Sequence, residues 1–207
     1  MKKLALVVVT VLIAQAGFAQ VTIDPEVGVN FSNLRTVVGD DDANTQDATV
    51  GFSAGVGVNI PLSEALYLKP GVYYERLGSE VEEAGVTSTT HLQYLSVPVN
   101  LGYRLPVGNA GAFFAEAGPY IGYALDGDVT VESADKDDVT NDIDFGDGSD
   151  EINRLDWGFD FGVGYETPWG IYIKGSYGLG LGNLSNASDV TTNNRNWNVG
   201  IGYRINI

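Results

Sequence analysis

The chain has 207 residues, no cysteine, and 11 lysines and arginines against 27 aspartates and glutamates, which gives a formal charge of −16. This charge argues against nucleic-acid binding, which needs cations opposite the phosphates, and the lack of cysteine excludes disulfides, thiolate metal sites and a cysteine nucleophile. With 27 glycines, 11 tyrosines and 8 phenylalanines, the composition is that of a single glycine-rich β domain.

Residues 1–20 have the parts of a secretory signal peptide. Two lysines precede an apolar run, and small residues, among them Ala19, stand where a signal peptidase cleaves. A membrane anchor is the alternative, but Gln15 interrupts the run before it reaches the length of a spanning helix. We therefore assign residues 1–19 to a signal peptide and residues 20–207 to one exported domain.

From residue 20 onward, odd and even positions separate into an apolar and a polar face. In the segment RLDWGFDFGVGYE, residues 154–166, aromatic and aliphatic side chains alternate with charged residues and glycines, and residues 196–207 repeat the pattern. A period of two is typical of β-strand. Similar runs begin near six other positions, Val21, Thr49, Leu66, His91, Ala112 and Gly170. We therefore predict eight strands of roughly ten to fourteen residues, about the length that crosses a membrane at a tilt.

The connections between these strands alternate in length. Three are short and carry proline or glycine, at 61–65, 106–111 and 167–170. Four are long and polar, near 37–48, 79–90, 126–153 and 183–194. Short turns at one rim and long loops at the other are the layout of an outer-membrane protein. The sequence thus predicts an all-β fold, an eight-stranded antiparallel up-and-down transmembrane β-barrel with both termini in the periplasm.

A soluble calycin-like ligand binder would also have eight alternating strands, but its apolar face would point inward. Here the polar face is rich in glycine, for example at Gly55 and Gly57. Glycine weakens a strand that faces water, whereas in a narrow lumen it makes room for long side chains opposite. Aromatic residues also gather near both ends of the apolar face, as at membrane interfaces: Tyr103, Tyr165 and Tyr203 at the short-turn end, and Trp157, Trp197, Tyr74 and Tyr123 at the loop end. We therefore expect the apolar face to meet outer-membrane lipid.

On this register the polar face turns a set of charged residues into the lumen: Asp24, Glu26, Lys69, Glu75, Arg104, Glu116, Arg154, Asp156, Asp160, Glu166, Lys174 and Arg204. An eight-stranded barrel encloses little more than its own side chains, so these charges must satisfy one another. We predict a lumen plugged by an ion-pair network, in which neutralising Arg104 or Arg154 lowers thermal stability. An ion path, or a catalytic carboxylate pair such as Asp156 with Asp160, is the alternative.

Most of the acidic residues fall in the four long connections, which we expect to be solvated, acidic and extracellular. The stretch NDIDFGDGSDE contains the calcium candidates Asp142, Asp144, Asp147 and Asp150, because hard cations prefer carboxylate oxygens. The spacing departs from that of an EF-hand, since the fifth position from Asp142 is Gly146, which has no side-chain oxygen. A solvated loop that attracts divalent cations is the alternative.

The single histidine, His91, is the candidate base of an enzyme that acts on lipid at the rim. Its position in the alternation is on the apolar face, at the loop end of the fourth strand, and Ser88 is expected to point to the opposite face. No nucleophile elbow or metal motif occurs in the sequence. We therefore predict no catalytic residue and no cofactor, and we interpret His91 as a polar interface residue.

Several strands resemble the PorT-like outer-membrane β-barrel family of Gram-negative bacteria. The resemblance rests on four segments, QYLSVPVNLGYRLP, AFFAEAGPYIGY, DWGFDFGVGYE and NWNVGIGYRI. It implies an eight-stranded outer-membrane barrel over residues 20–207 and, for some members, a link to protein secretion. The last strand also resembles the signal read by the barrel-assembly machinery, through Asn198, Gly200, Tyr203 and Ile205, although the chain ends in Ile207 and not in an aromatic residue.

These patterns predict a monomeric outer-membrane protein with a structural or interaction role, through surface contacts or as an accessory to secretion. The expected partners are outer-membrane lipid, the barrel-assembly machinery and divalent cations at the loops, and no nucleic acid. The alternatives are a small transport pore, which needs an open lumen, a lipid-modifying enzyme at the rim, and a soluble ligand binder.

Overall fold

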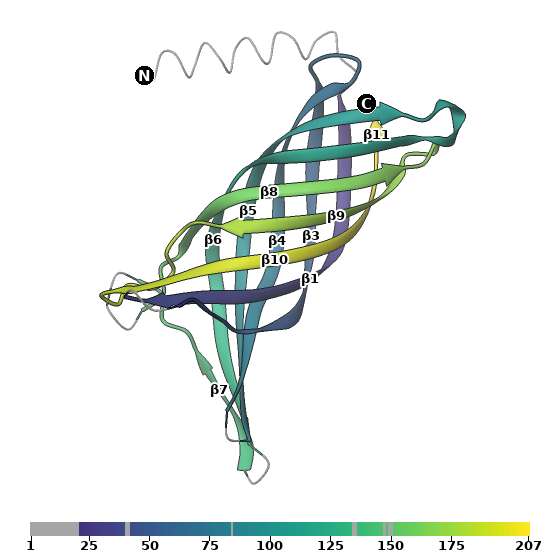
Figure 1. The fold of residues 1–207 in the computed structure, drawn as a ribbon. Helices are drawn as coiled ribbons and strands as arrows, with labels where there is room; N and C mark the ends of the chain where they lie inside the picture. The colour runs from purple at the N-terminus through teal and green to yellow at the C-terminus, as the bar shows by residue number, and fades with distance from the viewer. Residues whose placement is uncertain (1–20, 40–41, 84, 134–135, 147, 149–150) are drawn as a thin grey trace.

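A computed structural model describes residues 21–39, 42–83, 85–133, 136–146, 148 and 151–207. Within these residues, eight long antiparallel strands follow one another around a barrel, which β10 closes by pairing with β1 (Figure 1). The eight strands are β1 Thr22–Val38, β3 Asp47–Pro61, β4 Leu66–Glu83, β5 Val86–Pro106, β6 Ala112–Ser133, β8 Leu155–Glu166, β9 Ile171–Gly180 and β10 Val190–Tyr203. The predicted eight-stranded up-and-down β-barrel is confirmed.

Shorter elements complete the sheet. Strand β2, Asn44–Thr45, pairs with β1, and β7, Lys136–Asp142, pairs with β6. Strand β11, Ile205–Asn206, continues the C-terminal pairing with β1, and a 3-10 turn, Gly108–Ala110, joins β5 to β6. Among the described residues, no helix has the length and apolar character to cross a membrane. The predicted signal peptide, residues 1–19, lies outside the described residues.

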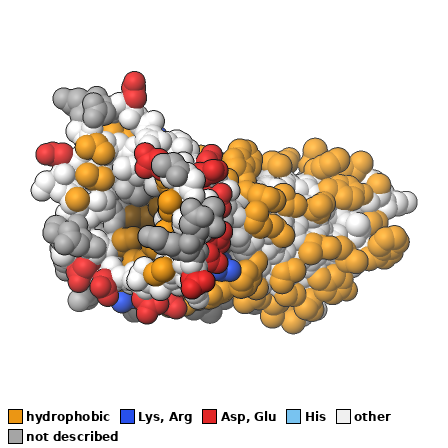
Figure 2. Space-filling model, turned by 90° about the horizontal axis from the view of Figure 1, so that it is seen from below, with side chains coloured by type: hydrophobic (Ala, Val, Ile, Leu, Met, Phe, Trp, Pro, Cys, Tyr) orange, Lys and Arg blue, Asp and Glu red, His pale blue; other side chains and the backbone are white. Residues whose placement is uncertain are grey.

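The barrel wall presents its apolar side chains outward. Trp157 and Val163 are 48% and 65% exposed, whereas Asp156 and Arg204 are 2% and 8% exposed. Figure 2 shows hydrophobic side chains over the barrel wall and acidic side chains gathered at one end. The apolar surface must meet hydrocarbon to be stable, so the orientation is that of a transmembrane barrel and the reverse of a soluble one.

The strands toward the loop end are longer than predicted. Strands β4, β5 and β6 have 18, 21 and 22 residues, and the segment 79–90, predicted as a long loop, is a hairpin paired as far as Glu83 and Val86. The prediction was wrong here because threonines and valines are interspersed among the acidic residues of this segment, and β-branched residues favour strand. Gly85, with φ +78°, permits the tight turn.

Candidate functional site

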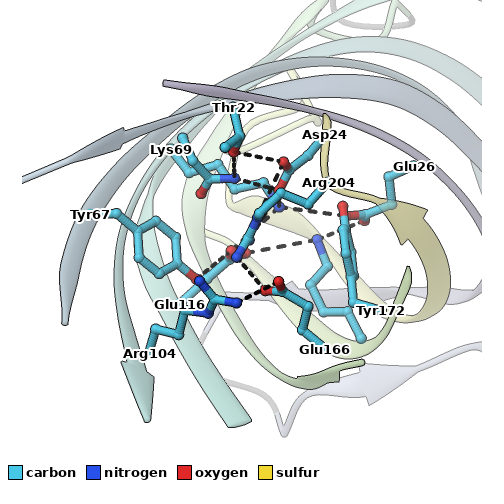
Figure 3. A network of polar contacts seen from close by, with 12 residues as sticks. Thr22, Asp24, Glu26, Tyr67, Lys69, Arg104, Glu116, Glu166, Tyr172 and Arg204 are labelled. Carbon is cyan, nitrogen blue, oxygen red and sulfur yellow. Dashed lines mark hydrogen bonds and ion pairs between the residues drawn. The ribbon is translucent and has the colours of Figure 1, made fainter. Parts of the chain in front are cut away.

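The short-turn half of the lumen holds a layer of ion pairs, which Figure 3 shows from close by. Lys69 Nζ on β4 lies 3.3 Å from Glu116 Oε1 on β6 and 3.7 Å from both Asp24 Oδ2 and Glu26 Oε2 on β1. Lys174 Nζ on β9 lies 2.6 Å from the other Glu26 oxygen and 3.9 Å from Glu116 Oε2. Two ammonium groups therefore serve three carboxylates contributed by two strands, and all five side chains are buried.

Arginines extend this layer toward the short turns. Arg204, between β10 and β11, contacts Asp24 Oδ2 at 3.1 Å through Nη2 and donates a second hydrogen bond to Glu166 on β8. Arg104 on β5 donates a 2.5 Å hydrogen bond to the other oxygen of Glu166. Asn59 on β3 donates to Asp24 through its amide. The layer thus takes side chains from β1, β3, β4, β5, β6, β8 and β9 and from Arg204, which follows β10, and its four cations face four carboxylates.

Two tyrosines that the sequence analysis did not identify belong to this layer. Tyr67 donates a 2.9 Å hydrogen bond to Glu116 Oε1, and Tyr172 donates one of the same length to Glu26 Oε2. The phenol of Tyr67 lies over Gly102, where a side-chain carbon would come within 2.1 Å of its ring. Each tyrosine lies two residues before a lumen lysine. The alternation of the strand therefore predicts that both tyrosines also face the lumen.

The middle of the lumen has a different composition. Glu75, Asp156 and Asp160 point inward as predicted, but no lysine or arginine nitrogen lies within 4.0 Å of their oxygens among the described residues. Ser96 donates a 2.5 Å hydrogen bond to Glu75, and Tyr120 donates one of 3.1 Å to Asp156. Glu75 and Asp156 therefore have neutral partners only, and no side-chain hydrogen bond to Asp160 is found among the described residues.

A ladder of asparagines lies beside these carboxylates. Asn198 donates to Asn30 Oδ1 at 2.6 Å and to Ser53 at 2.9 Å, and Asn30 in turn donates to the Phe52 carbonyl. These side chains are buried on the lumen face of β1, β3 and β10. Hydrogen bonds from these asparagine side chains therefore connect β1 and β10, the strands that close the barrel, to the neighbouring β3.

An apolar cluster occupies the loop end of the lumen, which the sequence analysis did not predict. Its buried members come from β1, β4, β5, β6 and the connection before β10: Leu34, Leu77, Leu92, Tyr94, Ala124 and Leu184. Ile143, Phe145 and Ile152, from the connection between β7 and β8, pack against this cluster. Burial of these side chains gives that connection an apolar anchor inside the barrel mouth.

Arg154 corrects the predicted network. The residue precedes β8 and its guanidinium lies over the Phe145 ring, 4.8 Å from the centroid, while Nη1 donates to the Ala124 carbonyl at 3.1 Å. Among the described residues, no carboxylate oxygen lies within ion-pair distance of it. The prediction was wrong because it assumed that the strand alternation already includes Arg154, whereas β8 begins one residue later, at Leu155.

The other candidate residues lie apart from the lumen. His91 is within β5, not at its end, and its Nδ1 is 3.4 Å from Asp128 Oδ2 on β6. Asp142 and Asp144 are exposed, and Asp147 and Asp150 lie outside the described residues. In the part of the chain that the structure describes, no three His, Asp or Glu side chains are placed to hold a metal ion directly.

Comparison with known proteins agrees with this architecture. Residues 14–186 match the family model of the outer membrane protein beta-barrel domain. The chain belongs to this family. Its outer-membrane localisation, predicted from the alternation, is thereby confirmed. A search of curated proteins finds no significant match.

Solved structures with a similar fold include three small barrels. Ail, the attachment invasion locus protein of Yersinia pestis, is 15% identical with a TM-score of 0.41, over 91% of this chain and 100% of that one. Neisserial surface protein A is 12% identical with a TM-score of 0.44, over 90% and 97% of the two chains. The N-terminal β-barrel domain of Pseudomonas aeruginosa OprF is 10% identical with a TM-score of 0.36, over 87% and 97%.

Proposed function

We propose that this protein is a closed outer-membrane barrel that acts through contacts made at its loop end, and that it neither conducts solutes nor catalyses a reaction. The proposal rests on one observation. At the loop end, some strands continue beyond the closed barrel and form a projecting part of the sheet that does not contribute to the barrel wall.

The length of the paired strands defines this projecting sheet. The last pair between β6 and β8 is Tyr123 with Leu155, yet β6 continues with β5 as far as the pair Ser133 with Val86. Strand β7 takes the place of β8 beside this outer part of β6, and β4 continues on the other side of β5. Strands β4, β5, β6 and β7 therefore extend away from the barrel as one sheet (Figure 1).

The projecting sheet is acidic. Its exposed acidic residues are Glu82, Glu83, Asp126, Glu132, Asp137, Asp138 and Asp142. Figure 2 shows acidic side chains at this end of the molecule. A negative surface steers and orients a partner of opposite charge, so the surface favours a partner with a basic face, on the extracellular side of the membrane.

The interior supports a closed barrel. The ion-pair layer fills the short-turn half, and the cluster around Leu92 fills the loop end. Between them lies a polar cavity of about 50 Å³, with room for a few water molecules. A lumen filled at both ends does not provide a continuous aqueous path for a solute.

Finer parts of the proposal follow the resemblance to PorT-like barrels. They are a role as an accessory to secretion, a monomeric state in outer-membrane lipid, and insertion by the barrel-assembly machinery through the last strand. None of these requires a catalytic group, and His91, paired with Asp128 on the outer face of the sheet, fits a polar position near the interface.

Two measurements test the proposal. In planar bilayers the purified protein should produce no stepwise conductance, and regular opening events would support a pore instead. In intact cells, a photo-crosslinking amino acid at position 82, in the projecting sheet, should yield a discrete protein adduct. The matched position 64, exposed in a short turn at the opposite end, should not yield that adduct. Absence of an adduct from position 82 and from a second site, 137, would contradict an interaction role.

A further inference from the structure

The lumen divides its charges unevenly along the barrel axis. In the short-turn half, four cations face four carboxylates at ion-pair distances. In the middle, Glu75, Asp156 and Asp160 have no cationic partner within 4.0 Å among the described residues. Burying a carboxylate without a compensating charge costs free energy. The protein alone therefore leaves this layer without a cation.

The nearest cations are engaged elsewhere. Lys174, which lines the same cavity as Glu75 and Asp160, has its Nζ 2.6 Å from Glu26. Arg195, beside Asn194 on β10, donates to the carbonyls of Gly180 and Asn194 through Nη1. Asn194 itself donates to Asp156 Oδ2 at 2.9 Å. The donors that reach Glu75 and Asp156 are therefore amides and hydroxyls, which do not neutralise a carboxylate, and no side-chain donor to Asp160 is found among the described residues.

Unpartnered oxygen atoms provide a second, independent observation. Asn196 Oδ1 and Asn100 Oδ1 are buried and accept no hydrogen bond, and their residues are 9% and 8% exposed. Asp156 Oδ1 is likewise buried without a donor. Asn100 lines the cavity of about 50 Å³ with Glu75 and Asp160, and Asn196 lines both this cavity and the adjoining one of about 20 Å³ that contains Asp156.

All of these groups are acceptors. The cavity is also lined by Lys174 and by the hydroxyls of Tyr73 and Ser176. Its carboxylate and amide oxygens suit a ligand that accepts electron pairs from oxygen, and hard cations coordinate such oxygens. Water alone would satisfy the amide oxygens but would not balance the negative charges that Glu75, Asp156 and Asp160 carry when they are ionised. A divalent cation balances two of them.

We propose that the middle of the lumen binds one hydrated divalent cation of the calcium class, between Glu75, Asp160 and Asp156. The three carboxylates are not placed to chelate it together. One or two of them, the Asn196 and Asn100 oxygens and retained water complete the coordination, as calcium sites permit. This cation has a structural role, because it fills the charge deficit between the ion-pair layer and the apolar cluster.

The site is distinct from the acidic surface. Calcium attracted to the projecting sheet exchanges with solvent, whereas a cation enclosed in the lumen stays with the protein. The proposed cation site is also independent of the interaction role. A barrel that has no protein partner would still bind the cation, and a barrel that has a partner could lack the cation.

The experiment refolds the protein in detergent with calcium chloride, passes it through a desalting column into calcium-free buffer, and measures retained calcium by elemental analysis. We expect about one calcium per chain, the single site the cavity provides. We also expect a higher melting temperature than in protein refolded with chelator at equal ionic strength in potassium chloride.

Two variants assign the site. The double substitution Glu75→Gln with Asp160→Asn should reduce retained calcium at least tenfold and abolish the calcium-dependent rise in melting temperature. It should still fold without calcium, since it removes uncompensated charge, and a heat-modifiable gel shift verifies this. The surface control Asp137→Asn with Asp138→Asn should retain calcium as the wild type does. No retained calcium in wild type, equal stabilisation by potassium chloride, or loss of calcium only in the surface variant would each overturn the proposal.

Discussion

The ring of Tyr172 fills the space above Gly202: a side-chain carbon at position 202 would come within 2.2 Å of the ring carbon that carries the hydroxyl. That hydroxyl donates to Glu26, which pairs with Gly202 from the other side on β1, so the ring cannot move aside without losing the hydrogen bond. The absence of a side chain at Gly202 thus leaves room for the Tyr172 ring on the neighbouring strand, and the Tyr172 hydroxyl orients the Glu26 carboxylate of the ion-pair layer.

We therefore expect Gly202→Ala to destabilise the barrel by about 1–3 kcal/mol, the usual cost of overpacking a filled interior. Gly175→Ala is the matched control. Gly175 also lies in a strand at negative φ, but nothing lies within 4 Å of a carbon added there. Unfolding in urea from lipid vesicles measures both, and equal stability of the two variants would contradict the packing of Tyr172 on Gly202.

Removal of the Lys69 ammonium should have a larger effect. Lys69 is 2% exposed and lies near three carboxylates, so Lys69→Met leaves these carboxylates to repel one another in a buried site. We expect a loss of about 3–5 kcal/mol. Adding Glu116→Gln to this variant removes the closest of the three charges and should restore part of the loss. A double variant less stable than Lys69→Met would show that Glu116 is not held by this lysine.

The apolar cluster at the loop end predicts a contrast between two leucines of β5. Leu92 is fully buried in the lumen, whereas Leu95 is exposed on the lipid-facing wall. Leu92→Ala leaves a cavity and should cost about 2–5 kcal/mol, whereas lipid chains can fill the space left by Leu95→Ala. The same unfolding measurement compares the two variants. A greater loss for Leu95→Ala would indicate that the mouth of the barrel is not packed as described.

Arg154 should behave as a local anchor. Its contacts are the Phe145 ring and the Ala124 carbonyl, so Arg154→Ala should cost about 0.5–1 kcal/mol, the range of an accessible cation–π contact. We expect hydrogen exchange of the described residues 143–146 and 151–153 to rise while the strands keep their protection. Arg204→Met, which removes two ion pairs, serves as the comparison and should destabilise the whole barrel.

The alternation of the sequence predicted the strand number, the order of the strands and the orientation of each face. These features are local, because the side chains of a strand alternate with a period of two and each barrel strand pairs with the next one along the chain. Even the lumen position of residues as far apart as Lys69 and Arg204 could be assigned, since each needed only its own strand. The extension of β4, β5 and β6 was missed, because threonine-rich polar residues are compatible with both loop and strand.

Which lumen residues meet was decided only by the closed barrel. Asp24 and Arg204 are 180 residues apart and come together because β1 pairs with the C-terminal strands. The separation into a balanced ion-pair layer, an uncompensated carboxylate layer and an apolar cluster depends on the stagger between all eight strands, which no single strand encodes. The sequence by itself determined which face each side chain takes, and the tertiary structure decided at what height and opposite which partner it lies.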